Sequence, residues 1–218
     1  MDGNRTQSLV ITLPEYERIF RVVYGVVKGV GLNPARACAH ISACGAYILN
    51  KYYKVPGKIV AGAAFFAVTD GPKPAVAAIG DMRDGQPYSD QGCFHVWVQT
   101  PTHAFDFQMP ILGETVAENW SGVAVPSRMF QRLLEEDCNG DYRRAGDFAF
   151  FPNPELIAHF NEVLFEGTLL TDMVSIIDAW FRKPPKPIKE AVQVMDSKEG
   201  AKWFRLAPVR VNGSWSAP

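Results

Sequence analysis

Apolar side chains recur at helical spacing in the N-terminal part of the chain. Residues 12–15 form a capping box, Thr-Leu-Pro-Glu, and the apolar positions that follow lie three and four residues apart as far as Gly29. Asn33 and Pro34 open a second helical stretch, which continues to about Tyr53. The pattern therefore predicts two N-terminal helices.

The spacing changes to short apolar runs in the middle of the chain. Residues 58–69 are small and apolar, which is typical of a strand buried on both faces, and residues 75–80 form a second short run. Residues 93–99 and 103–109 lie on either side of a short polar turn and predict a β-hairpin. Residues 81–91 are polar and predict an exposed loop.

Beyond Pro110 most of the signals are helical. Helices are expected at residues 127–136, 153–166 and 169–181, and a further strand is expected within residues 140–151. Helices followed by strands and then by helices fit the α+β class better than alternating α/β. We therefore expect a single domain, residues 1–218, with a catalytic core over residues 12–110 and a mostly helical part over residues 111–218 packed on it.

Composition and charge narrow the classes of function. The chain has 218 residues, of which 47% are hydrophobic, and its formal net charge is −1. A nearly neutral surface does not attract a polyanion, so we expect neither nucleic-acid nor membrane binding. The longest apolar run, residues 59–68, is too short to span a bilayer, and no signal-peptide core follows the polar N-terminus. These features predict a cytosolic protein and leave its oligomeric state open.

The four cysteines are expected to be unpaired in the cytosol, so each is either a small buried residue or a reactive thiol. Cys38 lies near the start of the second helix, where the helix dipole and free amides favour an anion and lower the pKa of a thiol. Cys44 lies two turns further along, where this effect has faded, and Cys93 has no helix terminus behind it. Acidic neighbours are expected to raise the pKa of Cys138.

The expected hairpin brings a histidine and a carboxylate together. If Thr100 and Pro101 form a two-residue loop, residues whose numbers add up to 201 lie opposite each other, and His95 then faces Asp106. Directly opposed side chains share a face, with Cβ atoms about 4.5–5.5 Å apart, so the imidazole and the carboxylate can hydrogen-bond. Such a carboxylate fixes the ring tautomer and stabilises an imidazolium, which makes His95 a candidate general base.

These residues follow an order that resembles the core of the transglutaminase-like branch of the papain-fold cysteine enzymes. In that family a cysteine opens a helix, and an Ile/Val-Pro-small-basic-apolar pattern then leads into a strand. Here Cys38 is followed by residues 55–62, Val-Pro-Gly-Lys-Ile-Val-Ala-Gly. The family's His-x-Trp-x-Glu and the Asp after it correspond to residues 95–99, His-Val-Trp-Val-Gln, and to Asp106. The resemblance covers residues 36–108, and the whole chain is similar to an uncharacterised bacterial family of this type.

The resemblance implies a papain-like fold, with N-terminal helices packed on an antiparallel sheet and additional C-terminal helices. It implies a triad of Cys38, His95 and Asp106 that performs covalent acyl transfer, as a peptidase or amidase or as a transglutaminase-like acyltransferase. The substrate would be a peptide, an amide or an acyl compound, and neither a metal nor an organic cofactor is required. The family's oxyanion hole combines the backbone N–H of the nucleophile with a second donor, for which Asn33 and Trp97 are candidates.

Departures from the family pattern leave alternatives open. The interval from Cys38 to Pro56 is one residue longer than is usual in the family, which keeps Cys44 as an alternative nucleophile, and Gln99 stands in place of Glu. A zinc site is disfavoured, because Cys38 and His40 would point about 200° apart on a helix. The remaining alternative is a non-catalytic binding or assembly module on the same fold.

Overall fold

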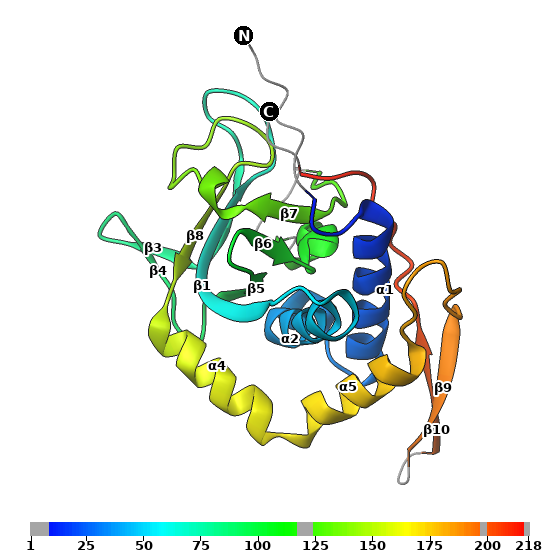
Figure 1. Cartoon of the computed structure of the whole chain (residues 1–218). Coiled ribbons are helices and arrows are strands. Elements are labelled where there is room, and N and C mark those ends of the chain that lie inside the picture. The colour runs from blue at the N-terminus through cyan, green and yellow to red at the C-terminus, as the bar shows by residue number, and fades with distance from the viewer. Residues whose placement is uncertain (1–8, 117–123, 197–199, 216–218) are drawn as a thin grey trace.

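A curled antiparallel sheet lies at the centre of the molecule, and helices pack around it (Figure 1). The computed structural model describes residues 9–116, 124–196 and 200–215. Four strands lie side by side across the sheet. Two further strands both pair with the first of these four, one on each of its two edges. The four are β1 (Lys58–Ala67), β5 (His95–Gln99), β6 (His103–Asp106) and β7 (Phe130–Leu133), and the other two are β2 (Val76–Ile79) and β8 (Phe148–Pro152).

Strand β1 has partners along both edges. Its first half pairs with β5, as far as Gly62 opposite His95, and its second half pairs with β2 on the same edge. Strand β8 runs along the other edge. After its first residue β1 is buried throughout, as the small apolar residues of this segment predicted. Gly62 allows the close approach of β8, because a Cβ atom there would lie 2.1 Å from the carbonyl oxygen of Phe151.

Helices α1 (Leu13–Gly29), α2 (Cys38–Ile48) and α5 (Thr168–Trp180) pack against one another, and α2 also packs on β5 and β1. The predicted capping box holds the start of α1, where the backbone N–H of Thr12 donates to the carboxylate of Glu15 at 2.8 Å. None of the helices in the described ranges is long and apolar enough to cross a membrane.

The second helical stretch is divided differently from the prediction. A 3-10 turn over residues 34–36 comes first, and the backbone then breaks at Ala37, with φ −113° and ψ 34°. Helix α2 starts after this break, and a π-helical turn, Leu49–Tyr53, follows its end. Cys38 is therefore the first residue of an α-helix.

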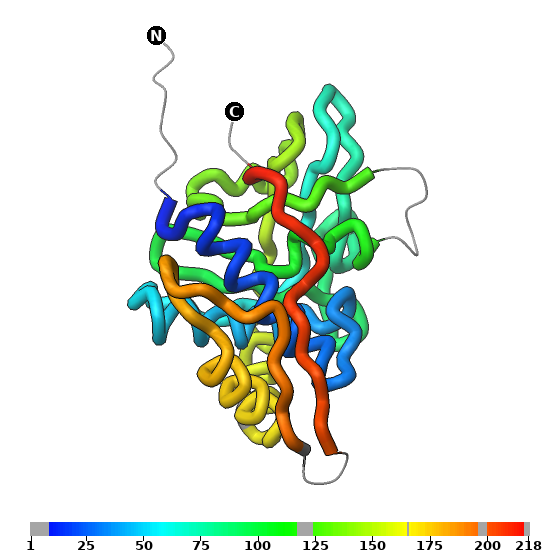
Figure 2. Tube along the Cα trace, turned by 90° about the vertical axis from the view of Figure 1, so that its right-hand side faces the viewer, coloured from blue at the N-terminus to red at the C-terminus, as the bar shows by residue number. Residues whose placement is uncertain are grey.

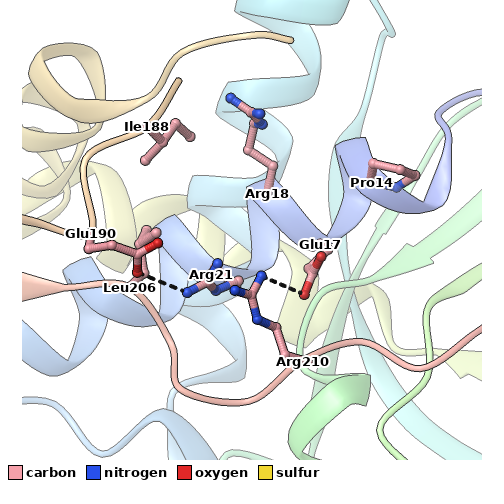
Figure 3. A pocket seen from close by; sticks show the side chains of 8 residues that line it. All are labelled: Pro14, Glu17, Arg18, Arg21, Ile188, Glu190, Leu206 and Arg210. Carbon is pink, nitrogen blue, oxygen red and sulfur yellow. Dashed lines mark hydrogen bonds and ion pairs between the residues drawn. The ribbon is translucent and has the colours of Figure 1, made fainter. Parts of the chain in front are cut away.

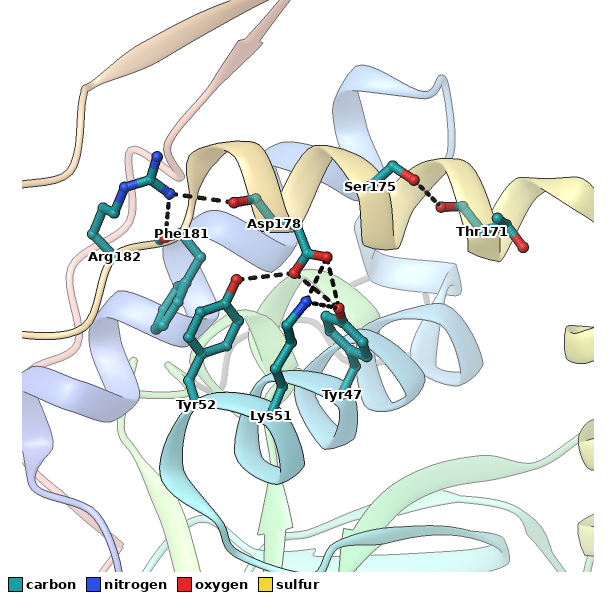
Figure 4. A network of polar contacts seen from close by, with 8 residues as sticks. All are labelled: Tyr47, Lys51, Tyr52, Thr171, Ser175, Asp178, Phe181 and Arg182. Atoms are coloured by element: carbon teal, nitrogen blue, oxygen red, sulfur yellow. Dashed lines mark hydrogen bonds and ion pairs between the residues drawn. The ribbon is translucent and has the colours of Figure 1, made fainter.

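A polar network holds α5 to the end of α2 (Figure 4). Asp178 on α5 accepts hydrogen bonds from the hydroxyls of Tyr47, at 2.8 Å, and Tyr52, at 2.9 Å. The ammonium group of Lys51 lies 2.7 Å from the same carboxylate. The network fixes the C-terminal end of α2, whose N-terminal end carries Cys38.

The described residues of the C-terminal part form two more helices and a hairpin. These are α3 (Leu112–Val116), α4 (Pro154–Glu166), and the strands β9 (Ala191–Asp196) and β10 (Gly200–Arg205). The hairpin packs along α1 (Figure 2). Gly29 of α1 makes room for it, because a Cβ atom there would lie 2.1 Å from the ring of Phe204.

Two segments differ in type from the sequence prediction. Residues 127–136 are not a helix but contain β7 and a 3-10 turn, because the free edge of β6 needs backbone partners and β7 supplies them. The expected loop at 81–91 contains a hairpin of β3 (Asp81–Arg83) and β4 (Gln86–Tyr88). The expected strand within 140–151 is confirmed as β8. The prediction of a mostly helical part after residue 110 was wrong, because the described residues there also form β7 and β8 of the central sheet and the hairpin of β9 and β10.

Candidate active site

A cleft of about 650 Å³ opens beside the N-terminal end of α2, the start of β5 and strand β2. The side chain of Cys38 lines this cleft and is 8% exposed. His95, the first residue of β5, lines the same cleft and is 1% exposed. Two of the three predicted triad residues therefore face one cavity, and they come from different elements.

The third residue, Asp106, contacts the second. Its Oδ2 atom lies 2.6 Å from Nε2 of His95, and both side chains are buried. The other carboxylate oxygen accepts the backbone N–H of Gln108 at 2.9 Å. The hydroxyl of Tyr16 on α1 donates to the backbone carbonyl of Asp106. The carboxylate is therefore held by His95 and Gln108, and the backbone of Asp106 is held by Tyr16.

The hairpin register differs from the predicted one. Val98 pairs with Phe105 and Gln99 with Ala104, so opposed residue numbers add up to 203 and not to 201. The N–H of Thr100 donates to the carbonyl of His103 at 2.8 Å, which makes Pro101 and Thr102 the loop.

On this register His95 and Asp106 are diagonal neighbours on one face of the sheet. Diagonal neighbours have Cβ atoms less than about 7–8 Å apart, which two polar side chains can span. The predicted contact is present, although the predicted direct opposition was wrong.

The surroundings of His95 favour its charged form. Burial alone would lower its pKa, but the charge and hydrogen bond of Asp106 outweigh burial, and the Cys38 thiol adds to them, so the pKa of His95 is raised to about 10. The second ring nitrogen, Nδ1, is buried and has no fixed hydrogen-bond partner among the described residues. The ring is therefore held through Nε2 and leaves Nδ1 available to the thiol.

The other cysteines have different environments. Cys44 is fully buried inside α2, and burial raises the pKa of its thiol to about 12. It does not line the cleft, so the structure brings Cys38 and not Cys44 to His95. Cys93 lines the cleft and is exposed. Burial, together with nearby acidic residues as predicted, raises the pKa of Cys138.

The two candidate oxyanion donors are placed differently. Asn33 lines the cleft, and its side-chain oxygen accepts the N–H of Ala35 at 3.1 Å. Trp97 does not line the cleft but stacks on Phe150, with ring centroids 4.2 Å apart. Of the two, only Asn33 borders the space where a reacting carbonyl would lie.

Sequence reasoning missed Gln108. Its side chain is 3% exposed, lines the cleft and donates from Nε2 to the carbonyl of Pro34 at 2.7 Å. It thereby links the segment after Asp106 to the turn that precedes Cys38. No pattern in the sequence marks this residue, because its position depends on how the chain turns after β6.

A second hollow, of about 280 Å³, lies between α1 and the C-terminal segment (Figure 3). Its charged side chains engage one another: Arg21 lies 3.2 Å from Glu190, and Arg210 lies 3.5 Å from Glu17. Neither cysteine nor histidine is among the described residues that line it. In the same described ranges, no three His, Cys, Asp or Glu side chains are grouped so that they could hold a metal ion.

Comparison with known proteins gives a family without an assigned activity. A family model described as "Protein of unknown function (DUF2026)" matches residues 12–215, so the chain belongs to this family. A crystal structure described as that of "genomics APC5867" is similar to this chain, with a TM-score of 0.81 and 28% sequence identity. The similarity covers 97% of this chain and 100% of that one. No curated protein matches the chain.

Proposed function

We propose that this protein is a cysteine-dependent acyl-transfer enzyme in which Cys38 is the nucleophile, His95 the acid and base, and Asp106 the group that orients His95. The observation that carries the proposal is the environment of the His95 ring. One nitrogen is bound to a buried carboxylate at 2.6 Å, and the other is buried, has no fixed hydrogen-bond partner among the described residues, and lies in a cleft that Cys38 also lines. This is the arrangement that nucleophilic catalysis by a thiol requires.

The reaction proceeds in two stages through an acyl-enzyme. The thiolate of Cys38 attacks the carbonyl carbon, a carbon–sulfur bond forms, and the bond to the leaving amine breaks as His95 protonates that amine. In the second stage water attacks the thioester. His95 accepts the proton of the water, the carbon–sulfur bond breaks, and a carboxylic acid and the thiolate are released. If an amine attacks in place of water, the product is a new amide.

The fold supports a papain-like and transglutaminase-like assignment. A helix that starts at the proposed nucleophile, α2, packs on an antiparallel sheet whose strands β5 and β6 carry the proposed base and its orienting carboxylate. We further propose that the enzyme works in the cytosol, where reducing conditions keep thiols free, as all four cysteines are in this structure.

Thiol labelling tests the proposed nucleophile and its base. We expect iodoacetamide to alkylate Cys38 faster than Cys93 at neutral pH, although Cys93 is the more exposed, because the imidazolium of His95 stabilises a thiolate. The change His95→Gln should slow labelling of Cys38 and leave that of Cys93 unchanged. The measurement is peptide mapping by mass spectrometry over time. Labelling of Cys38 no faster than that of Cys93, and insensitive to His95→Gln, would refute the proposal.

A second experiment separates hydrolysis from transfer. Peptide, acyl-glutamine and acyl-thioester compounds are incubated with the protein, with and without a primary amine. We expect an acyl adduct on Cys38 that is absent from Cys38→Ala. Release of a free acid identifies a hydrolase, and formation of a new amide identifies a transferase.

A further inference from the structure

In the part of the chain that the structure describes, the sheet has an open edge next to the proposed catalytic residues. Strands β5 and β2 follow one another along the same edge of β1, with His95 opposite Gly62 and Ile79 opposite Ala64. Strand β6 lies outside β5 and ends at Asp106. Outside β2, the described residues provide no paired strand. Among the described residues, the edge of β2 that faces away from β1 therefore has no neighbouring strand.

The backbone of β2 presents hydrogen-bonding groups along this outer edge, which faces away from β1. The N–H of Val68 donates to the carbonyl of Ala75 at 2.9 Å, so this pair bonds across the ladder between β1 and β2. Antiparallel ladders alternate, so the N–H and C=O groups of Val76 and Ala78 point away from β1. Ala67 of β1, which is paired with Val76, follows the same alternation. Its N–H and C=O groups bond residues 147 and 146, on the edge of β1 that faces away from β2.

This open edge borders the cleft that contains Cys38. Residues 76–80 line one wall of the cleft with small or medium apolar side chains, and residues 114–116 at the end of α3 also line it. The cleft volume, about 650 Å³, lies within the range of about 300–1,000 Å³ found for ligand sites. Ile79 and His95 are paired with residues of β1 that are two positions apart, so the two levels are separated by about 7 Å along the strand.

We propose that the substrate is an extended peptide segment that adds to the outer edge of β2 as a further strand and presents a carbonyl to Cys38. This inference rests on the proposed function and deepens it by naming the substrate class. Backbone donors and acceptors repeated at every second residue are the complement of another polypeptide backbone. A small amide or acyl group would engage at most one of these residues and would leave the others to water.

The test uses epoxysuccinate reagents, which alkylate thiols. One reagent carries a tetrapeptide arm on each side of the epoxide, and the other has both arms truncated. The second-order rate constant for alkylation of Cys38 is measured by mass spectrometry. Each backbone hydrogen bond contributes about fivefold to affinity, so pairing with Val76 and Ala78 should make the armed reagent at least about 25-fold faster.

Single N-methylation along the arms of the reagent examines the pairing directly on the unchanged protein. We expect methyl groups at alternate amides to slow alkylation about fivefold each and those between them to have little effect. The change Ala78→Pro removes an N–H that is not bonded to β1, and should lower the ratio of armed to truncated rates about fivefold. Ala78→Ser keeps the N–H and is the matched control, which should retain the ratio.

The outcomes separate this inference from the proposed function. If the arms give no acceleration, or N-methylation has no alternating effect, while the truncated reagent still alkylates Cys38 in a way that depends on His95, the peptide inference is wrong and the proposed function stands. If neither reagent alkylates Cys38 faster than Cys93, the proposed function itself fails. Should Ala78→Pro not fold, the N-methyl series decides the question.

Discussion

The contact between His95 and Asp106 allows a quantitative prediction. Both side chains are 1% exposed, so water does not screen the bond of 2.6 Å between them. A hydrogen bond to a charged group contributes about 1.5–3 kcal/mol to stability, and the buried position favours the upper part of this range. We therefore expect Asp106→Asn, which keeps the shape and removes the charge, to lower the free energy of unfolding by about 2–3 kcal/mol at neutral pH.

The pH dependence of this loss follows from the pKa of His95. In the folded protein this pKa is raised to about 10, whereas the unfolded value is about 6.5. The stabilisation is therefore fully present below about pH 6.5 and is lost as the pH rises through about 10. In Asp106→Asn burial dominates and lowers the pKa of His95, so the variant loses stability as the pH falls. The difference between the two proteins should widen as the pH falls from about 9 to about 6.

Two measurements check this prediction. Urea unfolding followed by circular dichroism at about pH 6 and about pH 9 gives the free energies. NMR of ¹⁵N-labelled histidine follows the protonation of His95 itself. Asp172→Asn, which changes an exposed carboxylate on α5, is the matched control and should alter neither. Equal stability of Asp106→Asn and the unchanged protein at both pH values, or a difference that widens as the pH rises, would refute the reasoning.

Three further changes test the packing around the site. Gly62→Ala should destabilise the protein by about 1–3 kcal/mol, because its Cβ atom would meet the carbonyl of Phe151; an unchanged melting temperature would contradict this. Cys44→Ser should cost about 1–3 kcal/mol in chemical unfolding by burying a hydroxyl, yet leave labelling of Cys38 intact; loss of that labelling would point to Cys44. Asp178→Asn should lower the melting temperature by about 2–4 °C in calorimetry, since the network at α5 is only partly buried, and no shift would show that it contributes nothing.

Local signals in the sequence predicted the elements that carry the site. The capping box, the small apolar run of β1 and the two arms of the hairpin each follow from near neighbours, and each is present in the structure. The position of Cys38 near a helix start was also predicted. That it is the first residue of α2 was not, because the backbone breaks at Ala37, and alanine is a strong helix former that gives no local signal of a break.

The hairpin register shows why a site can be predicted better than its geometry. Thr100 sets the loop, because its hydroxyl oxygen accepts the N–H of His103 at 2.9 Å and its own N–H bonds the His103 carbonyl. The register therefore moves by two positions. A shift of two leaves every side chain on its original face, whereas a shift of one would have moved His95 and Asp106 to opposite faces. For this reason the predicted contact between His95 and Asp106 is present even though the predicted register was wrong.

The relative placement of thiol and imidazole is a tertiary property that no local pattern encodes. Cys38 is positioned by α2, while His95 and Asp106 are positioned by β5 and β6. Gln108 connects the two, because its backbone N–H bonds Asp106 and its side chain bonds the carbonyl of Pro34 ahead of α2. A buried amide that bonds both segments fixes their distance only after both have folded. Reactivity of Cys38 that depends on His95 would therefore report the assembly of helix and sheet, in addition to the chemistry of the thiol.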